Sequence, residues 1–249
     1  QGCDEVNFIF SDMKIIADSE KEKFAAELFS EEIEIRTNKK PPVFDSRTGE
    51  CFVELVISDE SESEDFSIEH DGTKITVKAH RLRGLIYGYS MFLRKCVVHN
   101  GNLAAVKDIS GEYSPYMPIR GHQLSYTDMN NTYETWNEKQ YERYIRELMM
   151  FGTNTVEACL GDDEKHTDLM KYSFEEITKI KSQICETLDL NFSVFCAYSK
   201  RLSDEESSDY FCGCCHNIPK FNFYFPPGGD PGNLQAEEFF VRCKKVKKD

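Results

Sequence analysis

The stretch EDFSIEHDGTKITVKAHRLRGLIYGYSMFLRK, residues 64 to 95, contains two strand-like runs followed by a helical pattern. In the second run, Ile75 and Val77 alternate with polar residues, as in a strand with one buried face. Asp71-Gly72 separates the runs and has the composition of a two-residue hairpin turn, in which glycine supplies the positive φ. Apolar residues then recur at helical spacing from about Leu82 to Cys96. The stretch therefore predicts a sheet that is covered on one face by a helix.

The sequence on either side extends this unit. Ser19 and Glu22 form a capping box before a helix that ends ahead of Pro41-Pro42, and a further strand is predicted from Cys51. The acidic segment SDESESED, residues 58 to 65, lies between predicted strands, and the sequence assigns it no chemistry. Residues 1–108 are predicted to form a small α+β domain.

After Pro118 the pattern changes to alternating strands and helices, which favours a parallel sheet with right-handed crossovers. Capping residues at Asn137 and Ser173 begin two of the helices, while the polar stretch from Asn191 is interpreted as a helix or loop. The predicted strands are IRGHQLS, TNTVEACL from Thr153, and FNFYF from Phe221. Residues 116–249 are predicted to contain about four βα units, which is half of a (β/α)8 barrel.

The composition of the chain limits the kinds of partner that it can bind. The net charge of −14 argues against nucleic acid and anionic membranes, which need a basic face, and no apolar run is long enough to span a membrane. The ten cysteines follow no repeating spacing. The cluster Cys212 to His216 lacks a second ligand pair at zinc-finger spacing, so we expect no metal and no cofactor.

The combination of the opening stretch with MPIRGHQLSY and FYFPPGGDPG resembles glycoside hydrolases that join an α+β N-terminal domain to a TIM barrel. The nearest members are bacterial-type β-N-acetylhexosaminidases and α-glucuronidases. The resemblance implies a hydrolase of O-glycosyl bonds in carbohydrate metabolism, acting on a hexosaminide or uronide. It also implies a secreted or extracytoplasmic location. It ends at the fourth βα unit, so we expect this chain to lack the second half of the barrel and to be inactive alone.

The same resemblance supplies two candidate site residues. In β-hexosaminidases the fourth strand ends in Gly-Gly-Asp-Glu, where the Asp orients the acetamido group of the substrate and the Glu is the general acid. Asp230 matches that Asp, whereas Pro231 stands in the position of the Glu and cannot transfer a proton. The Arg of the first barrel strand, which holds sugar hydroxyls in that family, corresponds to Arg120.

Two further candidates follow from position in the predicted strands. Glu157 is placed near the carboxyl end of the second strand, where barrel enzymes keep catalytic or hydroxyl-binding groups. His122 lies on the first strand, where it could contact a ligand or serve as a core histidine. The other three candidates also have structural alternatives. Asp230 could stabilise a turn or cap a helix, Arg120 could form an internal salt bridge, and Glu157 could bind an internal partner.

Two interpretations of function stay open. The chain is either the front portion of a carbohydrate-active hydrolase whose acid or nucleophile lies elsewhere, or a non-catalytic carbohydrate-binding relative. Glycoside hydrolysis usually uses two carboxyl groups that flank the scissile bond, and the sequence shows Asp230 and Glu157 without a convincing acid. Because a half-barrel leaves an open sheet edge, we also expect self-association.

Overall fold

The computed structural model describes residues 8–45, 52–72, 74–105, 108–124, 135–159, 171–195, 218, 221–225, 235, 237, 240, 241 and 244. Its helices are α1 (Glu20–Thr37), α2 (Leu82–Arg94), α3 (Glu138–Met150) and α4 (Phe174–Thr187). Its strands are β1 (Phe8–Phe10), β2 (Lys14–Ile16), β3 (Val43–Phe44), β4 (Phe52–Ile57), β5 (Phe66–His70), β6 (Lys74–Ala79), β7 (Cys96–His99), β8 (Asn102–Ala105), β9 (Gly111–Tyr113), β10 (Gly121–Leu124), β11 (Thr155–Cys159), β12 (Asn191–Phe195) and β13 (Phe223–Phe225). The chain forms two compact units, Gln1–Pro118 with Met149–Gly152 and Ile119–Leu148 with Thr153–Asp249.

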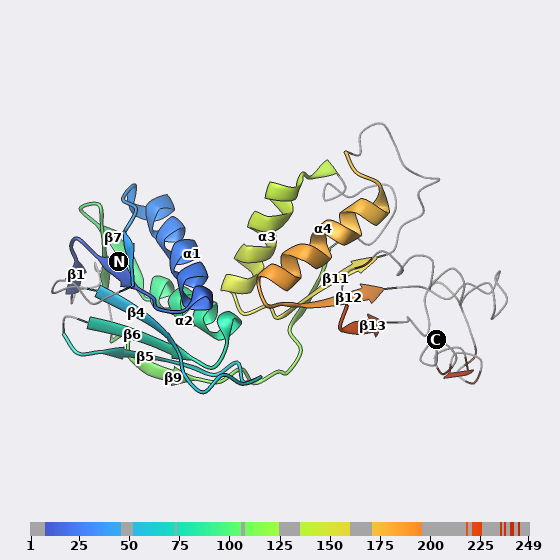
Figure 1. Ribbon diagram of the computed structural model, residues 1–249, viewed down its shortest axis with the longest axis horizontal. Coiled ribbons are helices and arrows are strands. Elements are labelled where there is room, and N and C mark those ends of the chain that lie inside the picture. The colour runs from blue at the N-terminus through green and yellow to red at the C-terminus, as the bar shows by residue number, and fades with distance from the viewer. Residues whose placement is uncertain are drawn as a thin grey trace, which may run out of the picture. The chain divides into compact units, whose positions relative to one another are not determined.

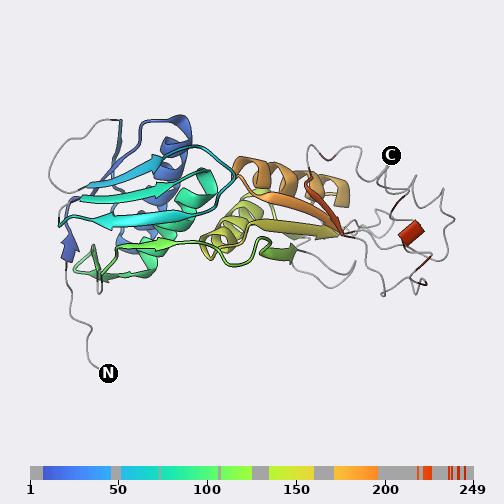
Figure 2. The ribbon, with the colours of Figure 1, turned by 90° about the horizontal axis from the view of Figure 1, so that it is seen from below.

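The first unit contains a six-stranded sheet in the order β3-β2-β4-β6-β5-β9 and a three-stranded sheet in the order β1-β8-β7. Strands β3, β2, β4 and β6 are parallel, whereas β5 is antiparallel to both β6 and β9. Gly72 joins β5 to β6 with a φ of 100°, so the predicted hairpin is confirmed. Helices α1 and α2 cover one face of the six-stranded sheet (Figures 1 and 2).

The beginning of α1 follows the predicted capping box. The Ser19 hydroxyl accepts a hydrogen bond from the Glu22 amide, and the Glu22 carboxylate accepts from the amide of Ser19 at 2.7 Å. That carboxylate also accepts from the amide of Ile57 at the end of β4, at 2.6 Å. One side chain therefore caps the helix and ties it to the sheet. These hydrogen bonds hold the pKa of Glu22 below its ordinary value, although desolvation, the largest influence, acts to raise it.

Helix α2 packs unusually close to β6 because two glycines face the sheet. A Cβ atom at Gly88 would lie 2.3 Å from Cγ1 of Val77, and one at Gly84 would lie 2.9 Å from the Cβ of Ala79. Around this contact the side chains of Leu85, Tyr89 and Phe92 are fully buried. The glycines in the opening stretch thus set the distance between the helix and the sheet.

The second unit contains a four-stranded parallel sheet in the order β10-β11-β12-β13, which confirms the predicted parallel arrangement. Helices α3 and α4 lie along one side of these strands (Figure 1). On that side the sheet contributes fully buried apolar side chains, including Leu124, Val156 and Val194. Helix α4 starts at the predicted Ser173–Glu176 capping box.

One local prediction in this unit is wrong. Residues Asn191–Phe195, interpreted as a helix or loop, form the strand β12, which pairs in parallel with β11. Phe192 and Val194 are buried, while Asn191 and Ser193 alternate with them on the other face. The polar residues made this segment resemble a loop in the sequence, but in the structure they form the second face of the strand.

The sheet of the first unit includes residues beyond 108. Strand β9 at Gly111–Tyr113 pairs with β5 and so belongs to that sheet. The domain ranges 1–108 and 116–249 stay predictions. None of the described helices is long and apolar enough to cross a membrane.

The close contact of α2 with β6 predicts the effect of adding one methyl group. Replacing Gly88 by Ala should lower the free energy of unfolding by about 1–3 kcal/mol, because the new Cβ would overlap Cγ1 of Val77, which is fully buried. Gly121→Ala is the matched control, since its Cβ would meet nothing nearer than 3.8 Å. Urea unfolding of both variants measures the difference. A Gly88→Ala protein as stable as the wild type would show that the helix can shift away from the sheet.

Candidate functional site

The parallel sheet has two chemically different faces. Residues that alternate with the buried apolar set carry polar side chains, and the register places Gln123, Glu157 and Ser193 side by side on β10, β11 and β12. In a parallel sheet such laterally matched residues point to the same side. The three side chains therefore meet on the face away from α3 and α4.

Glu157 is the centre of this group. Its Oε1 accepts a hydrogen bond from Nε2 of Gln123 at 3.0 Å, and its Oε2 accepts one from the Ser193 hydroxyl at 3.1 Å. Both donors are neutral, and no Lys or Arg in the described part of the chain forms an ion pair with Glu157. Partial burial raises the pKa of Glu157 above its ordinary value, and the two hydrogen bonds oppose that rise.

A carboxyl group held in this way has defined chemical capacities. As a carboxylate it accepts hydrogen bonds from hydroxyl or amide donors, and once protonated it can donate one. Glu157 lies two residues before the end of β11, about 7 Å below the carboxyl edge of the sheet. Ligands of parallel α/β sheets bind at that edge, so the group lies beneath the expected position of a ligand.

His122 is not brought together with Glu157. Its ring lies 6.1 Å from the ring of Tyr144 on α3, on the side of the sheet that the helices cover. The next residue, Gln123, contacts Glu157 instead. A displacement of one residue along a strand changes the face to which a side chain points.

Arg120 lies immediately before β10, at the amino end of the sheet. Its amide donates to Oδ1 of Asn154 at 2.8 Å, and its carbonyl accepts from the Asn154 amide at 3.1 Å. The four residues of β10 separate it from the carboxyl edge by about 13 Å. Asp230 and Pro231 lie outside the described residues, as does the cluster Cys212 to His216.

Sequence reasoning missed Ser193, because its segment was not predicted to be a strand. The alternation of Phe192 and Val194 with polar neighbours is the signal that could have found it. Among the described residues, no group of three or more His, Cys, Asp or Glu side chains could hold a metal ion.

Comparison with known proteins identifies the fold. No protein-family model matches the chain, and no curated protein matches it by sequence. Solved structures do: the family 20 β-N-acetylhexosaminidase of Streptomyces coelicolor superposes with a TM-score of 0.70 at 12% identity. The match covers 97% of this chain and 60% of that enzyme.

Two other solved structures also have this fold. A mutant β-hexosaminidase of Streptomyces plicatus, in complex with its product GlcNAc, gives a TM-score of 0.68 at 14% identity, covering 97% of this chain and 60% of the enzyme. The chitobiase of Flavobacterium johnsoniae gives 0.65 at 13%, with 98% of this chain and 46% of the enzyme covered. The chain thus has the fold of part of a family 20 glycoside hydrolase and spans about 60% of the two Streptomyces enzymes.

The raised pKa of Glu157 predicts how stability depends on pH. The folded protein retains the Glu157 proton to higher pH than the unfolded chain, so raising the pH from about 4 towards 7 removes stability. Glu157→Gln removes this titration and should gain stability relative to the wild type over that interval. Urea unfolding at several pH values measures the difference, with the exposed Glu186→Gln as control. A difference that does not change with pH would contradict the burial of Glu157.

Proposed function

We propose that the protein is a carbohydrate-active protein of the glycoside hydrolase type, and that it binds a saccharide at the carboxyl edge of the sheet β10-β13. The supporting observation is the agreement in fold over 97% of the chain with a β-N-acetylhexosaminidase. The sequential parallel order β10-β11-β12-β13 is what the first four units of a (β/α)8 barrel would show. We propose that the remainder of such a barrel closes this sheet in the working protein.

The proposed substrate is a hexosaminide or a uronide. In this proposal Asp230 orients the sugar from the segment after β13 that the sequence predicts to be a loop, as its match to the Gly-Gly-Asp motif implies. Glu157 supports the floor of the site with Gln123 and Ser193, and accepts a hydrogen bond from a sugar hydroxyl or from a water beneath it. The geometry gives less support to Arg120, at the amino end of β10, and to His122, on the helix-covered face.

Pro231 favours a second candidate function. Glycoside hydrolysis requires a proton donor next to the scissile bond, and proline has no such group. A non-catalytic carbohydrate-binding protein would keep Asp230 and the polar face while dispensing with the donor. An active hydrolase would instead supply its acid from another position.

Calorimetric titration of the full-length parent protein with N-acetylglucosamine tests the proposed site. Asp230→Asn keeps the shape of the side chain and removes its charge, so affinity should fall by about 1–3 kcal/mol, the scale of a charge-assisted hydrogen bond. Glu157→Gln should weaken binding in the same direction, whereas Glu186→Gln should leave it unchanged. If Asp230→Asn binds the sugar with unchanged affinity, Asp230 only stabilises a turn and does not contact the sugar.

The Pro231→Glu variant separates the two functions. If only the proton donor is missing, this variant of the full-length parent protein should hydrolyse an aryl N-acetylhexosaminide that the full-length wild type leaves intact. Hydrolysis by the wild-type protein would instead show that the acid lies elsewhere and would exclude the non-catalytic function.

A further inference from the structure

Strand β10 supplies Gln123 to the Glu157 group, yet its own side chains do little to fix its register. Of its four residues only Leu124 is both buried and apolar, and Gly121 has no side chain. Within the described part of the sheet, β10 pairs with β11 alone. Register is strongly specified where one face of a strand is well buried and weakly specified elsewhere. The alignment of Gln123 with Glu157 therefore depends on contacts made by other residues.

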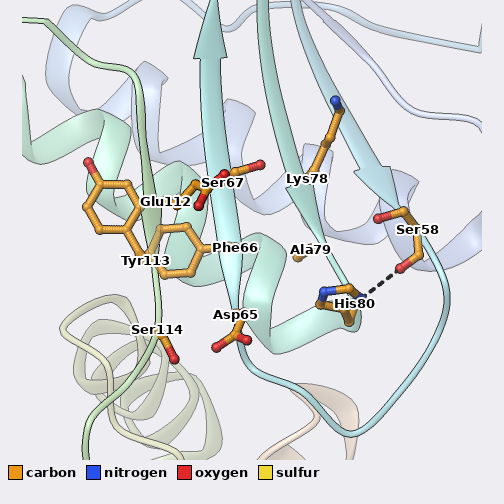
Figure 3. Close-up of a pocket in the computed structure, with 10 residues that line it drawn as sticks. All are labelled: Ser58, Asp65, Phe66, Ser67, Lys78, Ala79, His80, Glu112, Tyr113 and Ser114. Atoms are coloured by element: carbon orange, nitrogen blue, oxygen red, sulfur yellow. Dashed lines mark hydrogen bonds between the residues drawn. The ribbon is translucent and has the colours of Figure 1, made fainter.

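A register shift of one residue would change which side chain meets Glu157. The first unit shows how sharply alternation separates neighbouring side chains: Phe66 and Ser67 are successive residues of β5, and Figure 3 draws both. Phe66 lies on the face that α2 covers, since a Cβ atom at Gly88 of α2 would lie 3.4 Å from its ring. Ser67 faces the opposite side of the sheet. In the same way, a shift of β10 by one residue would bring a neighbour of Gln123 opposite Glu157.

The side chain of Asn154, the residue before β11, holds the start of β10. Asn154 is 1% exposed, and its Oδ1 accepts from the Arg120 amide at 2.8 Å while its own amide donates to the Arg120 carbonyl at 3.1 Å. The Thr155 hydroxyl donates to the same Oδ1 at 3.0 Å and so fixes the orientation of the side chain. The Asn154 carbonyl accepts from the Asn191 amide, at the start of β12, at 2.8 Å. Asn154 therefore connects the amino ends of three strands.

The same pair of hydrogen bonds recurs between β12 and β13. The Phe192 amide donates to Oδ1 of Asn222 at 3.0 Å, and the Asn222 amide donates to the Phe192 carbonyl at 2.7 Å. Like Asn154, Asn222 directly precedes a strand. In both places one asparagine binds the two backbone groups of a single residue near the start of the neighbouring strand. Such a pair of bonds is satisfied in only one register.

We propose that Asn154 is a positioning residue for the Glu157 group, because its two hydrogen bonds to Arg120 set the register of β10 on β11. Gln123 lies three residues after Arg120, and Glu157 lies three residues after Asn154, so the spacing is the same along both strands. The backbone of Arg120 is then what this position contributes to the site. The consequence for a sugar rests on the proposed function, whereas the positioning of Gln123 can be measured without a sugar.

The test is NMR spectroscopy of the full-length parent protein labelled with 13C and 15N. The Gln123 side-chain amide and the Glu157 carboxyl are assigned by their loss in Gln123→Ala and Glu157→Gln. In the wild type the Gln123 amide signal should follow the titration of Glu157, because the two groups share a hydrogen bond. In Asn154→Ala it should no longer follow. The pKa of Glu157 should then rise by about half a pH unit or more, since the bond from Gln123 lowers it.

Asn222→Ala is the matched control, because it removes the equivalent hydrogen bond between β12 and β13. Both variants should be less stable than the wild type, but only Asn154→Ala should uncouple Gln123 from Glu157. If Asn154→Ala does not fold, Asn154→Ser, whose side chain is too short to reach the Arg120 amide, gives the same comparison. A Gln123 amide that still follows Glu157 in the folded Asn154 variant would overturn the proposal, as would an equal loss in Asn222→Ala.

Sugar binding separates this inference from the proposed function. In calorimetric titration of the full-length parent protein with N-acetylglucosamine, Asn154→Ala should weaken binding about tenfold, the scale of one hydrogen bond to a charged group, and Asn222→Ala should not. A wild type that binds no sugar would contradict the proposed function, and the NMR result then decides the positioning of Gln123 on its own.

Discussion

The alternation of side chains in β10, β11 and β12 is the constraint on which the candidate site depends. Burying Leu124, Val156 and Val194 beneath α3 and α4 removes apolar surface from water, and each fully buried side chain of this kind contributes about 1.5–3 kcal/mol. Since successive residues point to opposite faces, this burial places the intervening polar side chains together on the other face. The Glu157 group is thus located by the packing of residues that take no part in its chemistry.

The elements that the sequence predicted correctly are those that are determined by residues close together in the chain. The capping boxes at Ser19 and Ser173 and the Asp71-Gly72 hairpin require only residues a few positions apart, and all three are present. Short strands such as β2 and β3 went unrecognised because their partners are distant in the chain. Strand β12 was misinterpreted because the polar half of its alternation resembled a loop.

The candidate site was predictable only in part. The strand position of Glu157 indicated a functional carboxylate, but its partners come from two other strands, and the register that joins them depends on the whole sheet. The sequence left open whether His122 contacts a ligand or is a core residue; the strand register and the contact with Tyr144 place its ring on the helix-covered face, whereas Gln123 faces Glu157. The ion pairs of the acidic segment at 58–65 could not be predicted either, because their partners Lys21, Arg81 and Arg83 lie elsewhere in the sequence.

The most direct test of the central claim, that the polar face of the parallel sheet supports a saccharide site, follows the side-chain carboxyl of Glu157. Its 13C resonance can be assigned by its loss in Glu157→Gln and titrated with pH in the absence and presence of N-acetylglucosamine. A ligand that donates a hydrogen bond to this group, directly or through a water, changes the pKa of Glu157, so we predict that the titration midpoint moves when the sugar is bound. An identical titration curve at saturating sugar would contradict the account.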